Sequence, residues 1–209
     1  IPQNGEELAF KNINTSEGIN EQYINAIDGL TVEELFFFGN YVPDNYRINI
    51  LRKLVKTKPI FVSEYIDNKS DIVNAYQINQ NEGFVCCVRD KENYYYEKIP
   101  DTIVNENNSN IETISDAKNF LYLIGSQLTD KENYLNSIAA TNYDIVLIDL
   151  FFNETKLNQS DLNKIRYKAN GGKRLIIAYM SIGSAENYRY YWQSNWRKGN
   201  PSFISKPYA

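Results

Sequence analysis

Six short, uninterrupted apolar runs constrain the fold of this chain more than any other feature of its sequence. They lie at residues 29–38, 59–67, 83–89, 119–125, 143–151 and 174–183. Because polar residues do not alternate through these runs, we interpret each one as a β-strand that is buried on both faces. Amphipathic stretches separate the runs, and residues 45–57 place Ile48, Leu51 and Leu54 on one helical stripe. Strands that alternate with helices in this way predict an α/β protein.

The composition limits the chemistry that the chain can perform. Its 209 residues include no histidine and carry a net charge of -4. Without histidine the chain cannot form a Ser-His-Asp triad or a histidine-ligated zinc site, so carboxylates, tyrosine, lysine and serine remain. The acidic balance argues against a nucleic-acid partner, because phosphate contacts need clustered lysine and arginine. No apolar run approaches the roughly 18 residues of a transmembrane segment. We predict neither a cofactor nor a metal site.

One segment interrupts the alternation near the middle of the chain. Residues 101–115 (DTIVNENNSNIETIS) are rich in asparagine and poor in large apolar side chains, and they show no clear periodicity. We interpret them as a linker or long surface loop between residues 1–100 and residues 116–209.

Polar side chains, most of them acidic, lie within or just after four of the predicted strands. They are Glu33, Glu34, Glu64, Asp67, Asp149, Ser181, Ser184 and Glu186, with Tyr65 and Tyr179 at matching positions on their strands. In α/β folds, functional groups gather where parallel strands end. Any one carboxylate could instead form a buried ion pair or cap a helix. Several strand ends that each carry one favour a carboxylate-lined site.

An aromatic cluster follows the last predicted strand. Residues 186–192 (ENYRYYW) and Trp196 combine tyrosine and tryptophan with acid, amide and arginine groups. Such side chains line sugar-binding clefts, where ring faces stack on the sugar and polar groups bind its hydroxyls. An aromatic packing helix would look the same, so both interpretations remain open. The run of tyrosines at 94–96 is less informative and suits packing at a strand edge.

Several sequence blocks, taken together, resemble one enzyme family. The blocks are NFLYLIGSQ (119–127), YDIVLIDLFF (143–152), GGKRLIIAYMSIGSAENYRYYW (171–192), IDGLTVEELFF (27–37), KPIFVSEYID (58–67) and GFVCCVRD (83–90). They resemble the TIM-barrel glycoside hydrolases typified by endo-α-1,4-polygalactosaminidase. Residues 1–100 are similar to the C-terminal half of that family and residues 116–209 to its N-terminal half, so the order of the halves is reversed.

The family's middle portion, with a strand written like GFDGVYLD, has no counterpart in this sequence. The resemblance therefore implies a (β/α) TIM-type barrel that is incomplete or circularly permuted in this chain. Either the sequence spans parts of two tandem domains, or it is a permuted domain without its middle segment. Both ends of the sequence suit either explanation. In each case another chain or segment would complete the barrel.

The resemblance implies that Glu33, on the strand IDGLTVEEL, is the general acid of glycoside hydrolysis. Strand alternation would turn Glu34 to the opposite face. The family's second catalytic carboxylate lies on the absent strand and matches no residue here. The implied substrate-binding residues are Gln3, Asn4, Tyr65, Asp149, Tyr179, Glu186, Tyr188 and Arg189. For Asp149, direct catalysis is the alternative role.

The substrate implied by the resemblance is an α-1,4-linked polysaccharide that contains galactosamine, and an acidic cleft would attract its cationic groups. Enzymes of this kind act outside the cell, which predicts an extracellular or cell-surface protein. Two alternatives remain open. The chain could be a carbohydrate-binding module without turnover, or a structural surface protein that keeps only the scaffold.

Overall fold

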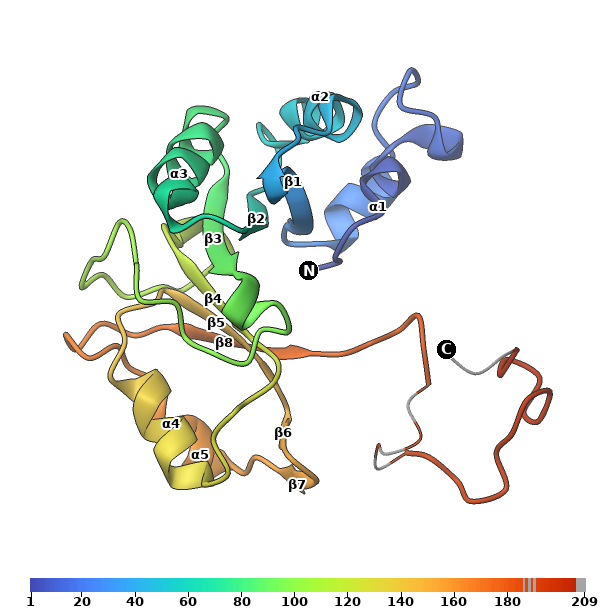
Figure 1. Ribbon diagram of the computed structural model, residues 1–209. Coiled ribbons are helices and arrows are strands. Elements are labelled where there is room, and N and C mark those ends of the chain that lie inside the picture. The colour runs from blue at the N-terminus through green and yellow to red at the C-terminus, as the bar shows by residue number, and fades with distance from the viewer. Residues whose placement is uncertain (186, 188, 190, 206–209) are drawn as a thin grey trace.

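The structure is a computed structural model that describes residues 1–185, 187, 189 and 191–205. Six parallel strands form its framework, and each of the six apolar runs overlaps one of them (Figure 1). They are β1 (Leu30–Tyr41), β2 (Ile60–Ile66), β3 (Val85–Asp90), β4 (Phe120–Leu123), β5 (Ile145–Asp149) and β8 (Leu175–Tyr179). The strands and the helices between them confirm the predicted α/β class.

The strands form open sheets. One parallel sheet has the order β1-β2-β3 and the other has the order β4-β5-β8. The short strands β6 (Phe151–Phe152) and β7 (Thr155–Lys156) pair as an antiparallel ribbon. The expected TIM-type barrel, incomplete or permuted, is therefore wrong. A barrel of that type needs eight strands in one closed ladder, whereas in the described residues β3 and β4 share no ladder and β1 and β8 stand at the outer edges.

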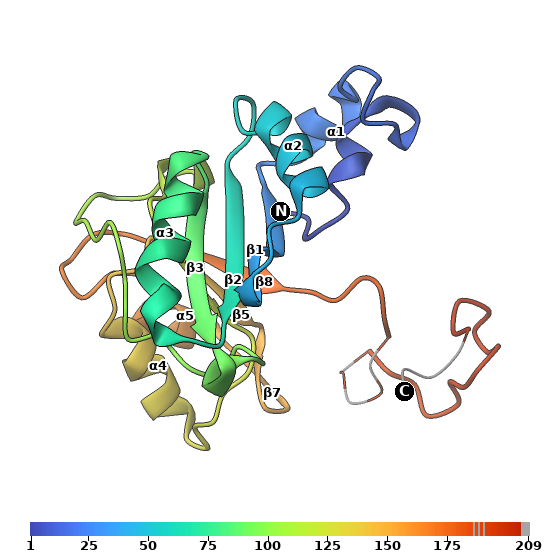
Figure 2. The same cartoon turned by 45° about the horizontal axis from the view of Figure 1, so that its top comes forward.

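In the part of the chain that the structure describes, the helices cover the outer side of each sheet. The first sheet is covered by α1 (Glu21–Ala26), α2 (Asn45–Leu54) and α3 (Ile72–Asn81), and the second by α4 (Lys131–Ala139) and α5 (Gln159–Lys164) (Figure 2). Short 3-10 turns lie at Glu6–Ala9, Lys11–Ile13, Lys69–Asp71, Lys91–Asn93 and Ile114–Asp116. Among the described residues, none of the helices has the length and hydrophobicity needed to span a bilayer.

The other side of both sheets forms a third apolar cluster. Strand alternation turns Val62 toward the helices and Phe61 away from them, and Val146 and Ile145 divide in the same way. The rings of Phe61 and Phe120 meet edge to face at 5.4 Å, which joins the two sheets. We call this side of both sheets the inner face.

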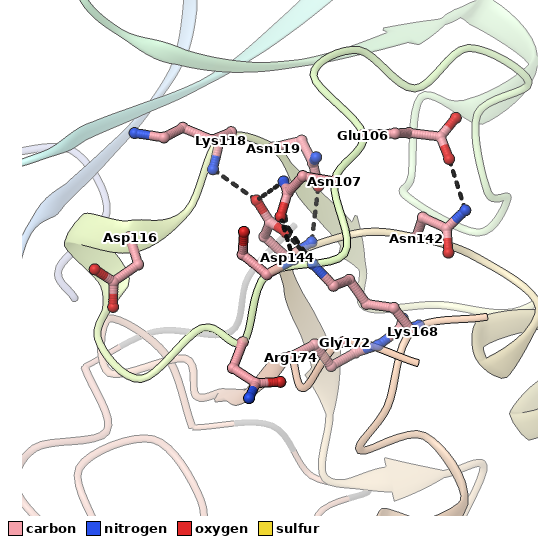
Figure 3. Close-up of polar contacts among 12 residues, drawn as sticks. Glu106, Asn107, Asp116, Lys118, Asn119, Asn142, Asp144, Lys168, Gly172 and Arg174 are labelled. Atoms are coloured by element: carbon pink, nitrogen blue, oxygen red, sulfur yellow. Dashed lines mark hydrogen bonds and ion pairs between the residues drawn. The ribbon is translucent and has the colours of Figure 1, made fainter. Parts of the chain in front are cut away.

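A buried ion pair fixes the asparagine-rich segment to the second sheet. Asp144 precedes β5 and accepts hydrogen bonds from Lys168 Nζ at 2.8 Å, from the Lys118 amide at 2.7 Å and from the Asn107 side chain (Figure 3). The side chains of Asp144 and Lys168 are both fully buried. Ile111, also in this segment, donates its amide hydrogen to Lys173 O. The segment therefore packs against the amino end of the second sheet.

Candidate functional site

The inner face changes from apolar to polar along the strand direction. Near the amino ends of the strands it carries apolar residues: Phe61, Phe120, Ile145 and Leu175. Near the carboxyl ends, the cross-strand pair Tyr65 and Arg89 lies on the first sheet, and the pair Asp149 and Tyr179 on the second. The predicted residues Tyr65, Asp149 and Tyr179 thus share one end of one face, where parallel strands place functional groups.

A bulge in β1 brings two adjacent glutamates to this face. The register between β1 and β2 jumps from Glu33 opposite Ser63 to Phe38 opposite Tyr65, and Glu34 adopts a left-handed φ of 56°. The Glu33 carboxylate accepts a hydrogen bond from Tyr96, and the Glu34 carboxylate accepts one from Arg89. The expected alternation of these two side chains therefore fails, because the bulge interrupts the strand between them.

The bulge is held from the helix side by Glu64. This buried carboxyl accepts the amide hydrogens of Phe36 at 3.1 Å and Phe37 at 3.0 Å, and the Asn79 side chain at 2.9 Å. Burial raises the pKa of Glu64, and these hydrogen bonds oppose the shift. Glu64 therefore supports the backbone that carries Glu33, and its own side chain lies away from the inner face.

The backbone around Glu33 is anchored by the N-terminal segment. Pro2 and Asn4 form backbone hydrogen bonds with Thr31 at the free edge of β1, so residues 2–4 make an isolated parallel bridge there. Arg47 donates to the Glu33 carbonyl at 2.9 Å and to Asn4 Oδ1 at 2.8 Å, and Asn4 Oδ1 also accepts the Glu33 amide at 3.4 Å. Asn4 thus contacts the Glu33 backbone.

Gln3 reaches across the inner face to the second sheet. Its Oε1 accepts a hydrogen bond from the hydroxyl of Tyr122 on β4. The ring of Tyr122 lies 4.4 Å from that of Tyr96 and 6.5 Å from that of Tyr179. This series of tyrosines runs from Tyr96, which contacts Glu33, to Tyr179, which lies opposite Asp149 in the β5–β8 ladder. Burial raises the pKa of both Tyr96 and Tyr122, so their hydroxyls stay protonated and can donate.

Arg89 links Glu34 to the aromatic side chains. Its side chain is only 3% exposed and its Nη2 lies 2.8 Å from Glu34 Oε1. The guanidinium carbon lies 4.4 Å from the ring centre of Tyr96 and 5.4 Å from those of Tyr65 and Tyr94. Contacts of this length between a cation and aromatic faces are attractive. The ion pair and the rings fix Glu34 beside Glu33.

Asp149 is the acidic residue of the second sheet. Its Oδ2 forms an ion pair with Arg189 Nη1 at 2.6 Å, and its Oδ1 accepts the Phe151 amide hydrogen at 2.9 Å. The predicted residues Asp149 and Arg189 therefore contact each other. Glu186 and Tyr188, also predicted for the site, lie outside the described residues.

Sequence reasoning missed Ser63, Arg89, Tyr96 and Tyr122 as members of this site. The signal for Ser63, Arg89 and Tyr122 was present, because each occupies an inward position of a strand by simple alternation. Tyr96 follows β3 in an irregular segment, where periodicity gives no direction. Among the described residues, no group of three or more acidic or cysteine side chains is arranged to hold a metal ion.

Two cavities border this cluster or lie apart from it: Arg89 lines the first, whereas Glu33, Glu34 and Asp149 line neither. A cavity of about 230 Å³ lies between α3 and residues 98–102, with Tyr76 and Val88 in its wall. Another of about 290 Å³ is bounded by Leu162 of α5 and Ile176 of β8. Val88 and Ile176 point to the outer sides of their sheets, so neither cavity opens at Glu33. The chemical groups of the inner face, rather than cavity size, identify the candidate site.

Comparison with known proteins gives partial matches. A stretch of 99 residues is 33% identical to an uncharacterized protein of Methanocaldococcus jannaschii, covering 47% of this chain and 27% of that protein. A stretch of 81 residues is 35% identical to an uncharacterized protein of Deinococcus radiodurans, covering 38% and 25% of the two chains. An uncharacterized protein of Thermotoga maritima is 26% identical over 69 residues, 33% of this chain and 21% of that protein.

No protein-family model and no solved structure matches the chain. Each match covers about a quarter of the relative's own length or slightly less. By sequence, therefore, between 33% and 47% of this chain is similar to a segment of longer proteins from these three organisms.

Proposed function

We propose that the protein is a glycoside hydrolase that cleaves an α-1,4-linked, galactosamine-containing polysaccharide, with Glu33 as the proton donor. The observation that supports this most is the position of Glu33 on the inner face, where Tyr96 binds its carboxylate and Tyr65 and Asp149 lie on the same face. The resemblance of the surrounding sequence blocks to polygalactosaminidases supplies the substrate class. From the same resemblance we infer that the protein acts outside the cell or on its surface.

The chemistry needs one protonated carboxyl that gives its proton to the glycosidic oxygen. Tyr96 binds Oε1 of Glu33, and among the described residues no group is hydrogen-bonded to Oε2. Glu33 can therefore present Oε2 to a substrate while Oε1 is held. Its carboxyl forms no ion pair with a described cation, so it can carry a proton without losing such a pair.

The groups around Glu33 suit a sugar chain. Phe38, Tyr65, Tyr94 and Tyr95 form a continuous aromatic series with ring separations of 6.2, 5.0 and 5.2 Å. Tyr94 and Tyr95 are 39% and 73% exposed, so part of each side chain is accessible to a ligand. Aromatic faces pack on the C–H surfaces of sugar rings. Asn4, Gln3, Tyr179 and the pair of Asp149 and Arg189 would bind hydroxyl or amino groups.

The test is the Glu33→Gln variant of the full-length protein, assayed with galactosamine-containing polysaccharide. We expect release of reducing ends to be abolished, because the amide cannot donate the proton. Binding of the polysaccharide should stay within about tenfold of the parent, since the amide is nearly the same size. Glu112→Gln is the control, because that side chain is 64% exposed and paired with Lys173. Unchanged turnover in Glu33→Gln would exclude this function.

One observation favours a second candidate, a carbohydrate-binding or structural surface protein without turnover. Glu34 and Asp149 are each ion-paired with an arginine, which leaves Glu33 alone among the three acids without a cation partner in the described residues. A hydrolase needs a second carboxylate to attack or to activate water. Binding of the polysaccharide by the parent protein without release of reducing ends would favour this candidate.

A further inference from the structure

We propose that Tyr96 and Ser63 form a hydrogen-bond chain that positions the Glu33 carboxyl and stabilises it as it loses its proton. The inference rests on the proposed function and adds two positioning residues to it. Ser63 lies directly opposite Glu33 in the β1–β2 ladder. Tyr96 comes from the segment after β3, 63 residues beyond Glu33 in the chain.

The three side chains form a continuous line of oxygen atoms. The Tyr96 hydroxyl donates to Glu33 Oε1 and lies 3.0 Å from Ser63 Oγ. A phenol has one hydrogen, so when Tyr96 donates to Glu33 its oxygen accepts the hydrogen of Ser63. Ser63 is 2% exposed and Tyr96 is 7% exposed. Water therefore has little access to the hydrogen bonds that Tyr96 makes with Glu33 Oε1 and with Ser63.

The backbone holds Tyr96 in a conformation that tyrosine rarely adopts. Its φ is 57°, in the left-handed region. The Tyr96 amide donates to Asn93 O at 3.0 Å, and its carbonyl accepts the Gly125 amide at 3.1 Å. Arg89 and Tyr122 pack against its ring, each 4.4 Å from the ring centre. An unfavourable conformation that the surroundings maintain in this way is typical of a residue whose position matters for function.

The hydrogen bonds from Ser63 to Tyr96 and from Tyr96 to Glu33 stabilise the charged form of Glu33 more than the neutral form. A hydrogen bond to a carboxylate is stronger than one to a neutral carboxyl group. As the proton leaves Oε2 for the glycosidic oxygen, negative charge develops on the carboxyl and the bond from Tyr96 strengthens. Tyr96 and Ser63 keep their own protons throughout. An interaction that strengthens toward the transition state raises kcat rather than substrate affinity.

The test compares Tyr96→Phe and Ser63→Ala with the parent full-length protein on galactosamine-containing polysaccharide, with kcat and KM measured across pH. For Tyr96→Phe we expect kcat to fall by about 10- to 100-fold while KM stays within about threefold. The alkaline limb of the kcat profile should move up by about one pH unit, because the proton donor keeps its proton longer without the phenol. Ser63→Ala should lower kcat and raise the alkaline limb in the same way, but by smaller amounts than Tyr96→Phe.

Tyr143→Phe is the matched control. Tyr143 is 3% exposed, and its hydroxyl has no hydrogen-bond partner among the residues that the structure describes, so the variant removes a buried hydroxyl from the outer side of the second sheet. We expect its kcat and alkaline limb to equal those of the parent. If Tyr96→Phe only lowers the fraction of folded protein, circular dichroism shows the loss and the alkaline limb stays in place, which would overturn the inference. Suppose that the parent is active, that Glu33→Gln is inactive and that Tyr96→Phe keeps the kcat of the parent. This result would overturn the role of Tyr96 and leave the proposed function intact. Full turnover in Glu33→Gln would overturn the proposed function itself.

Discussion

The Lys168→Met variant tests the role of the buried ion pair at the amino end of the second sheet. Lys168 and Asp144 have fully buried side chains whose charged atoms are 2.8 Å apart. Removing one partner of a buried pair costs about 3–5 kcal/mol of unfolding free energy, because the other charge stays in a poorly solvating environment. Asp144 keeps the Lys118 amide at 2.7 Å and the Asn107 side chain. We therefore expect a loss near the lower value, about 3 kcal/mol.

The measurement is urea unfolding followed by circular dichroism. Lys173→Met is the control, since its pair with Glu112 lies at the surface and should contribute less than about 1 kcal/mol. Adding Asp144→Leu to Lys168→Met removes the uncompensated charge and should recover part of the loss. If Lys168→Met unfolds at the same urea concentration as Lys173→Met, then the pair does not carry the stability that its burial implies.

Two further predictions concern single positions. Because burial raises the pKa of Glu64 above its ordinary 4.5, the stability that its protonated form contributes is complete below that pH and is lost as pH rises through the folded pKa. As pH rises from about 4.5, the free energy of unfolding measured with urea should thus fall less for Glu64→Gln than for the parent. An equal fall for the two proteins would contradict the argument. A Cβ at Gly172 would lie 2.6 Å from the Asn108 carbonyl oxygen, whereas one at Gly183 meets no atom within 4 Å. Gly172→Ala should lower the melting temperature and cost about 1–3 kcal/mol, and Gly183→Ala should change it little; equal melting temperatures would refute this.

The strands could be predicted from the sequence because each apolar run is long enough to form a buried strand and is bounded by polar residues. Tyr65, Asp149 and Tyr179 are predicted site residues because of their positions near strand ends, and in the structure these three residues share one face. Alternation fails at Glu34, since a left-handed φ in the middle of a strand leaves no periodic signal in the residues themselves.

The sheet topology could not be predicted in the same way. Similarity of sequence blocks implied a TIM-type barrel that is incomplete or circularly permuted in this chain, but barrel formation depends on strand count and on pairing between segments far apart in the chain. The positions of Tyr96 and Gln3 are also long-range results. Tyr96 lies in an irregular segment, and Gln3 reaches a tyrosine 119 residues away in the chain. Local patterns contain no information about such contacts.

The buried charge pair and the acidic inner-face groups lie at opposite ends of the same strands. Asp144 immediately precedes β5, and Asp149 is its last residue. Side chains at the carboxyl ends of the strands can therefore be replaced during evolution without breaking the buried ion pair at the amino ends. If the proposed function holds, related proteins that bind different ligands should differ mainly around Tyr65 and Tyr179, while Asp144 and Lys168 change together or remain as they are.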